Sequence, residues 1–85
     1  MNFGQAIQAM RDGECVQRAG WNGKGMHIYL EDWMEGTLRF GLGDRKYEPV
    51  IVMFTAQKTH QPGWLASQAD MLAEDWEYTR EADEH

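Results

Sequence analysis

The sequence contains a single cysteine, Cys15, among its 85 residues. One cysteine cannot form an internal disulfide, so the fold must be held together by its core alone. A lone thiol also predicts a reducing environment, and the first residues lack the basic and apolar regions of a secretory signal. We therefore expect a cytoplasmic protein, which would be the host cytoplasm if the gene belongs to a phage.

Long hydrophobic runs are also missing. The longest apolar stretch covers residues 50–54, whereas a membrane span needs about 18 or more apolar residues. We expect no membrane partner. The sequence has no repeats or linkers, and a chain of this length has room for one core only. The expected organisation is a single α+β ligand-binding domain over residues 1–80 and an acidic tail over residues 81–85.

Positive charge is scarce. Eight Lys and Arg stand against fourteen Asp and Glu, which gives a formal net charge of −6. Non-specific binding of nucleic acid needs a basic surface that displaces counterions from the phosphates, so we exclude DNA and RNA as partners of that kind. A small phosphorylated ligand remains compatible with this composition, because one site can be locally basic on an acidic protein.

Arrangements typical of catalysis or metal binding are lacking as well. Cys15 alternates within an expected strand and has no convincing base, so a buried, inert thiol is the better interpretation. The three histidines have no ligand spacing with one another. Asp70 and Asp75 could form a carboxylate pair, but a helix cap and a turn explain them equally well. We expect no enzyme, no metal and no cofactor.

The first residues predict a short helix. Asn2 suits the N-cap and Gln5 stands three residues later, which is a variant of the capping box. Gly13 suits the position just after the helix. The apolar face follows helical spacing and contains Phe3, Ala6, Ile7 and Met10.

The remaining pattern predicts mainly strands, over residues 14–18, 26–31, 50–54 and 75–79. Alternation over 26–31 indicates a half-buried strand, and the continuous apolar run over 50–54 indicates a strand covered on both faces. We expect a polar loop over 58–63 and one helical turn after Ser67. Residues 31–46 fit either a weak hairpin or a loop. The fold class is α+β, with the N-terminal helix packed on a small antiparallel sheet.

Two segments are candidates for ligand binding, and the first is Trp-Asn-Gly-Lys-Gly at residues 21–25. Asn-Gly favours tight turns, so an ordinary hairpin explains this segment about as well. The functional interpretation is that Gly23 and Gly25 free backbone N–H groups to face an anion beside Asn22. Lys24 would add positive charge, and Trp21 would stack on a base. Arg18 could add a bidentate phosphate contact.

The second candidate segment is residues 62–71, in which a tryptophan follows Pro-Gly and precedes small and polar residues. Trp64 would form a pocket wall, with Ser67, Gln68 and Asp70 as hydrogen-bonding groups at its rim. The alternative is that Trp64 fills the core while Ser67 caps a helical turn and Asp70 occupies its third position.

Four blocks of the sequence resemble one small family of phage and prophage proteins that includes the second type of Thoeris anti-defence proteins. They are Asn-Phe-Gly-x-Ala at 2–6, Gly-Trp-Asn-Gly-Lys-Gly-Met at 20–26, Tyr-Glu-Pro-x-Ile-Val-Met at 47–53 and Trp-Leu-Ala-Ser-Gln-x-Asp-Met-Leu-Ala-x-Asp-Trp at 64–76. The resemblance spans most of the chain, and the last block is long enough to be specific.

The resemblance implies a protein that binds and sequesters glycocyclic ADP-ribose, the cyclic nucleotide signal of Thoeris defence, without cleaving it. It implies a helix on an antiparallel sheet, assembled as dimers and then tetramers with pockets between subunits. In this chain the segment 32–46, which in family members can carry a helix that joins dimers, is short. We therefore expect a homodimer and leave the homotetramer open.

Applied to this chain, the resemblance implies that Trp21 and Trp64 are the stacking residues. It also implies that the 22–25 turn forms the phosphate site together with Arg18. The polar residues of the second segment would meet ribose hydroxyls or the adenine edge. The alternative from another class is a phage or prophage module that binds a host protein through its aromatic surface, which Trp33 and the acidic tail would favour.

Overall fold

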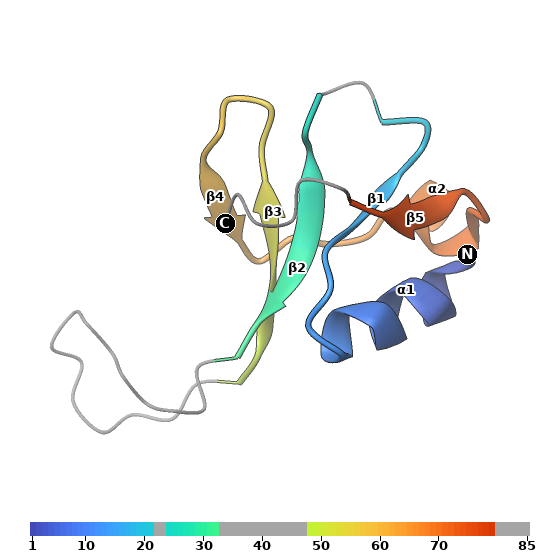
Figure 1. The fold of residues 1–85 in the computed structure, drawn as a ribbon, viewed down its shortest axis with the longest axis horizontal. Coiled ribbons are helices and arrows are strands. Elements are labelled where there is room, and N and C mark those ends of the chain that lie inside the picture. Colours follow the sequence, from blue (N-terminus) through green and yellow to red (C-terminus); the bar gives the residue numbers. More distant parts are fainter. Residues whose placement is uncertain (22–23, 33–47, 80–85) are drawn as a thin grey trace, which may run out of the picture.

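A computed structural model describes residues 1–21, 24–32 and 48–79 of the chain. Along the sequence, a helix is followed by four strands, a short second helix and a last strand (Figure 1). They are α1 (Phe3–Arg11), β1 (Val16–Arg18), β2 (His27–Glu31), β3 (Val50–Phe54), β4 (His60–Pro62), α2 (Gln68–Leu72) and β5 (Trp76–Tyr78).

The strands form one sheet in the order β4-β3-β2-β1-β5, and each neighbouring pair is antiparallel. The last strand, β5, lies beside the first, where Arg18 stands opposite Trp76. This pairing brings the end of the described chain next to its beginning, and α1 packs near both (Figure 1). The predicted α+β class, with the helix on an antiparallel sheet, is confirmed.

The helix α1 begins and ends where local signals predict. The Asn2 side chain accepts a hydrogen bond from the Gln5 backbone at 2.8 Å, and the Gln5 side chain accepts one from the Asn2 backbone at 2.9 Å. Gly13 follows the helix with a φ of 93°, a conformation that L-residues rarely adopt. The capping box and the glycine after the helix are both confirmed.

The main core lies between α1 and the sheet. Its buried residues come from the helix and from β1, β2, β3 and β5, so the core links α1 to four of the five strands of the sheet. They are Ala6, Ala9, Met10, Val16, Ile28, Met53 and Trp76. In the described ranges, no helix is long and apolar enough to cross a membrane.

Two expectations about the strands were wrong. In β2, His27, Ile28 and Tyr29 are all buried, so the strand is covered on both faces there instead of alternating. A second cluster that includes Tyr29 and Val52 accounts for this burial. The expected loop over 58–63 contains β4, which pairs with β3 at the sheet edge, where Pro62 is tolerated.

Three predictions concern residues outside the described part of the chain. They are the weak hairpin or loop over 31–46 beyond residue 32, the Asn22-Gly23 centre of the first candidate segment, and the acidic tail over 81–85.

Candidate functional site

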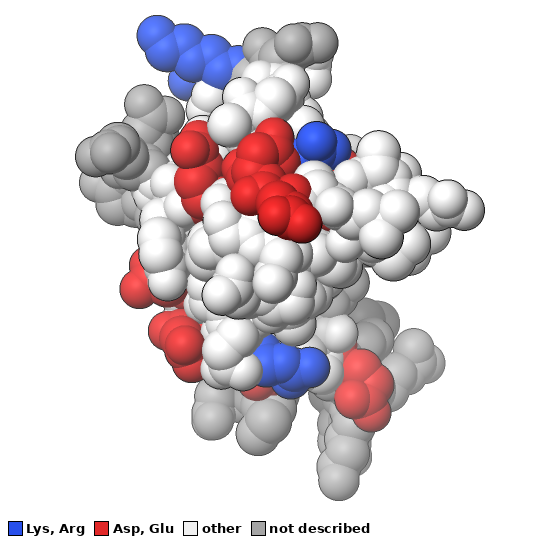
Figure 2. Space-filling model, turned by 90° about the vertical axis from the view of Figure 1, so that its right-hand side faces the viewer, with Lys and Arg blue, Asp and Glu red and all other residues white. Residues whose placement is uncertain are grey.

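The two candidate segments meet on one side of the molecule, beside β5 and α2. Figure 2 shows this side, which lies to the right in Figure 1. Acidic side chains gather near its middle, while Lys and Arg side chains are scattered around them. Both Lys24 and Gln68 are exposed to solvent. An anionic ligand would therefore meet a surface whose centre is acidic and whose cations stand apart.

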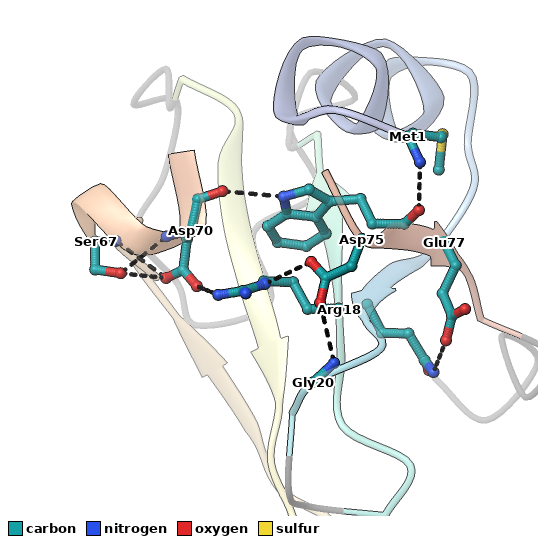
Figure 3. A network of polar contacts seen from close by, with 9 residues as sticks. Met1, Arg18, Gly20, Ser67, Asp70, Asp75 and Glu77 are labelled. Carbon is teal, nitrogen blue, oxygen red and sulfur yellow. Dashed lines mark hydrogen bonds and ion pairs between the residues drawn. The ribbon is translucent and has the colours of Figure 1, made fainter. Parts of the chain in front are cut away.

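Arg18 is the centre of a polar network that joins three parts of the chain (Figure 3). At the end of β1, its Nε donates to Asp75 Oδ1 at 2.9 Å and its Nη1 donates to Asp70 Oδ1 at 3.0 Å. These partners lie 57 and 52 positions further along the sequence. Arg18 is therefore paired with carboxylates, so a phosphate would have to compete for its guanidinium group.

Asp70 also completes the cap of α2. Its Oδ2 accepts hydrogen bonds from the Ser67 backbone at 3.0 Å and the Ser67 hydroxyl at 2.9 Å. In return, the Ser67 hydroxyl oxygen accepts from the Asp70 backbone at 3.1 Å. The structure thus places Ser67 in the capping role that the sequence left open as the alternative, and it brings Arg18, Ser67 and Asp70 together.

Asp75 belongs to the same network, although sequence reasoning left it out of the site. Its Oδ2 accepts from the Gly20 backbone at 3.2 Å, while its Oδ1 accepts from Arg18. The only signal in the sequence for this role was that Asp75 is an acidic residue at the start of a predicted strand. That signal becomes informative only once β1 and β5 are known to be neighbours.

Electrostatics keep this network ionised. Burial alone would raise the pKa of the Asp70 carboxyl, but the hydrogen bonds from Ser67 and Arg18 outweigh it and lower that pKa. The hydrogen bond from Arg18 lowers the pKa of Asp75, and the two carboxylates raise the pKa of Arg18. The network carries one positive charge against two negative charges at neutral pH.

Three tryptophans form a cluster next to the network. Trp76 is buried, with 2% of its surface exposed, and Trp21 and Trp64 are half-buried against it. Ring centroids lie 5.4 Å apart for Trp21 and Trp76, 6.3 Å for Trp64 and Trp76, and 6.1 Å for Trp21 and Trp64. The indole Nε1 of Trp76 donates to the Asp70 carbonyl at 3.0 Å, which joins the cluster to the network.

The geometry of the cluster limits how a base could stack. The planes of Trp21 and Trp64 are inclined by 68°. A base held between two rings needs them nearly parallel and about 7 Å apart, twice the ~3.5 Å contact distance. A base therefore cannot be sandwiched between Trp21 and Trp64 in this arrangement, and stacking would use the outer face of one ring.

A cavity of about 450 Å³ lies away from these residues, between the last turn of α1 and the adjoining ends of β2 and β3. Its lining is mostly apolar, with one Arg and one Glu: Ile7, Met10, Arg11, Leu30, Glu48, Pro49 and Ile51. None of the residues predicted for the site lines it.

The buried thiol agrees with its interpretation from the sequence. Cys15 is 1% exposed, and burial, followed by the nearby Glu14 charge, raises the pKa of its thiol to about 11. A thiol of this kind stays protonated at neutral pH and is a poor nucleophile. Within the described ranges, no group of His, Cys, Asp and Glu is arranged to hold a metal ion.

The fold and this site define a small α+β domain whose single antiparallel sheet carries a tryptophan cluster and an ion-pair network at one side. The chain belongs to the Thoeris anti-defense 2-like family, whose domain matches residues 1–79. It is similar to Thoeris anti-defense 2 of Bacillus phage SP01, with 38% identity over 82 residues that cover 91% of this chain and 92% of that protein. The family resemblance is confirmed, and it places the chain among the Thoeris anti-defence proteins.

Proposed function

We propose that this protein binds a cyclic nucleotide immune signal of the glycocyclic ADP-ribose type and sequesters it without cleaving it, thereby inhibiting Thoeris defence. The observation that carries the proposal is the family match over residues 1–79, supported by the similarity to a phage anti-defence protein. A protein that removes a signal by binding needs affinity and no catalytic group. The protonated, buried Cys15 is consistent with that requirement.

The site offers a chemically suitable surface for such a ligand. The outer faces of the half-buried Trp21 and Trp64 can stack on adenine, which is worth about 1–3 kcal/mol per base in single-strand binding proteins. Lys24, in the turn after Trp21, is the exposed cation closest in sequence to the stacking residues. The Ser67 hydroxyl and the Asp70 carboxylate are hydrogen-bonding groups of the kind that ribose hydroxyls require.

Tight sequestration favours a site completed by a second copy. A nanomolar complex requires about −12 kcal/mol of binding free energy, and high affinity depends on enclosing much of a small ligand. In the described part of one chain, the Trp21 and Trp64 rings are half-buried and each can offer a base an outer face, which leaves the rest of a bound nucleotide exposed. Around α2, Leu65, Met71 and Leu72 are exposed by 88%, 47% and 78%, and α2 itself buries no side chain. We include in the proposal a homodimer with this surface at its interface.

The experiment is to incubate the purified protein with glycocyclic ADP-ribose, remove free ligand, denature the protein and identify what is released. Intact nucleotide in stoichiometric amount supports sequestration. A converted nucleotide would make the protein an enzyme. If nothing is retained, the proposal fails and the protein-interaction alternative is favoured.

Two lysines give a matched test of the phosphate contact. Lys24→Gln removes a charge three positions after Trp21 in the sequence, whereas Lys58→Gln removes one from the turn between β3 and β4. Both side chains are exposed, so neither change should affect folding. We expect weaker nucleotide binding for Lys24→Gln only. Equal affinities for the two variants would remove Lys24 from the site.

The same exposed apolar side chains are the observation that favours the alternative function, a module that docks on a host protein. The two functions differ in what Leu72→Ser changes. If α2 forms the homodimer interface, native mass spectrometry should show dissociation together with weaker nucleotide binding. A monomeric wild-type protein that retains no nucleotide would favour the alternative.

A further inference from the structure

The Arg18 network leads to an inference that rests on the proposed function and concerns the same site. We propose that Arg18 is a positioning residue and not a phosphate ligand. Through Asp70 it holds α2, and through Asp75 it holds the turn that carries Trp21, in their binding arrangement.

The first argument comes from how α2 is attached. None of its side chains is fully buried, so apolar packing contributes little to fixing its position. Polar contacts of Asp70 do so instead: its carboxylate accepts from Arg18, and its carbonyl accepts from the Trp76 indole. Arg18 thereby determines where the cap of α2, with Ser67, stands relative to the tryptophan cluster.

The second argument concerns the turn that carries Trp21. The Trp21 backbone N–H donates to the Arg18 carbonyl at 3.1 Å, and the Gly20 N–H donates to Asp75. Asp75 also accepts from the Arg18 side chain (Figure 3). The Asp75 carboxylate therefore holds both the Arg18 guanidinium group and the backbone next to Trp21. In this way it restricts the orientation of the Trp21 side chain.

The third argument is electrostatic. Arg18 is shared between two carboxylates, so the three groups together carry a net negative charge. A diphosphate approaching the guanidinium group of Arg18 would be repelled by the carboxylates of Asp70 and Asp75, which already offset its positive charge. Displacing Asp70 would release α2, and displacing Asp75 would release the Gly20 backbone. A phosphate that displaced either carboxylate would thus disrupt the site to which it was binding.

The two roles of Arg18 predict opposite effects of one substitution. Asp75→Asn removes a carboxylate that competes for the guanidinium group. If Arg18 positions the site, this variant should bind glycocyclic ADP-ribose about tenfold more weakly, because preorganisation is lost. If Arg18 binds phosphate, freeing it should tighten binding, and tighter binding in calorimetric titrations would overturn the proposal. The matched control is Glu74→Gln, which removes a neighbouring exposed charge and should leave the affinity unchanged.

A second measurement keeps the inference testable without any ligand. Near-UV circular dichroism reports the environment of the tryptophans, and hydrogen exchange reports the amides of residues 20–21 and 67–72. For Asp75→Asn we expect an altered near-UV spectrum and faster exchange at both segments, with neither change for Glu74→Gln. An unaltered spectrum and unchanged exchange would refute the positioning role. Absence of nucleotide binding by the wild-type protein would instead refute only the proposed function.

Discussion

Replacing Trp76 by phenylalanine tests the connection between the tryptophan cluster and the polar network. Trp76 is buried, its ring packs against Phe3 at a centroid distance of 5.5 Å, and its Nε1 donates to the Asp70 carbonyl. Phenylalanine keeps an aromatic ring at this place but removes the N–H donor and part of the ring system. The variant should fold, with reduced stability and with α2 held less firmly.

The expected cost has two parts of similar size. The smaller ring buries about 50 Å² less apolar surface, which is worth about 1 kcal/mol. The lost hydrogen bond adds about 1 kcal/mol, because Asp70 is half-buried and water can solvate its carbonyl once the indole is gone. We expect a total of about 2 kcal/mol in the free energy of unfolding.

Urea unfolding followed by far-UV circular dichroism measures this loss at 25 °C and at one protein concentration. With a slope of about 1 kcal/mol per M, the midpoint should fall by about 2 M. The control is Trp64→Phe, at a half-buried ring, which should cost less than about 1 kcal/mol. A Trp76→Phe midpoint within about 0.5 M of the wild type would refute the reasoning.

Three further predictions follow from the described contacts. Because the folded-state pKa values of Asp70 and Asp75 are lowered, their stabilisation is complete above about pH 4 and is lost as pH falls through the folded values. Thermal unfolding between pH 6 and pH 2.5 should show this loss, and Asp70→Asn should reduce its slope. Ser67→Ala should cost about 1 kcal/mol by urea titration through loss of the N-cap, whereas an unchanged midpoint would show that α2 is uncoupled from folding. Cys15 should resist iodoacetamide at pH 8 in the folded protein and react after unfolding in urea. Rapid native labelling would contradict its burial.

Local signals in the sequence predicted the elements they govern. Asn2 and Gln5 cap α1 through side chains that reach only three residues along the chain, and Ser67 with Asp70 repeats this device at α2. The apolar run 50–54 became β3, whose last three residues are buried. Such features can be predicted from the sequence because the residues that interact to form them are close together in the chain.

Features that depend on contacts between distant residues could not be predicted from the sequence. β4 consists of His60, Gln61 and Pro62, a polar segment that becomes a strand only because β3 offers it an edge. The burial of Tyr29 requires a second cluster on the other face of β2. In the same way, the proposed role of Arg18 changed once the structure paired it with Asp70 and Asp75. The sequence placed Arg18 near a candidate turn but could not reveal which side chains would surround it.

The position of β5 at the edge next to β1 has a consequence for how the protein is made. Arg18 leaves the ribosome long before Asp70 and Asp75, which follow it by 52 and 57 positions. The β2–β3 ladder can pair earlier in synthesis. Pairing β1 with β5 joins residues such as Gln17 and Glu77, which are 60 positions apart, and is entropically slower. A nascent or truncated chain that ends before residue 75 lacks both Asp75, which pairs with Arg18, and Trp76, which is the buried member of the tryptophan cluster. The candidate site therefore exists only in chains translated beyond β5.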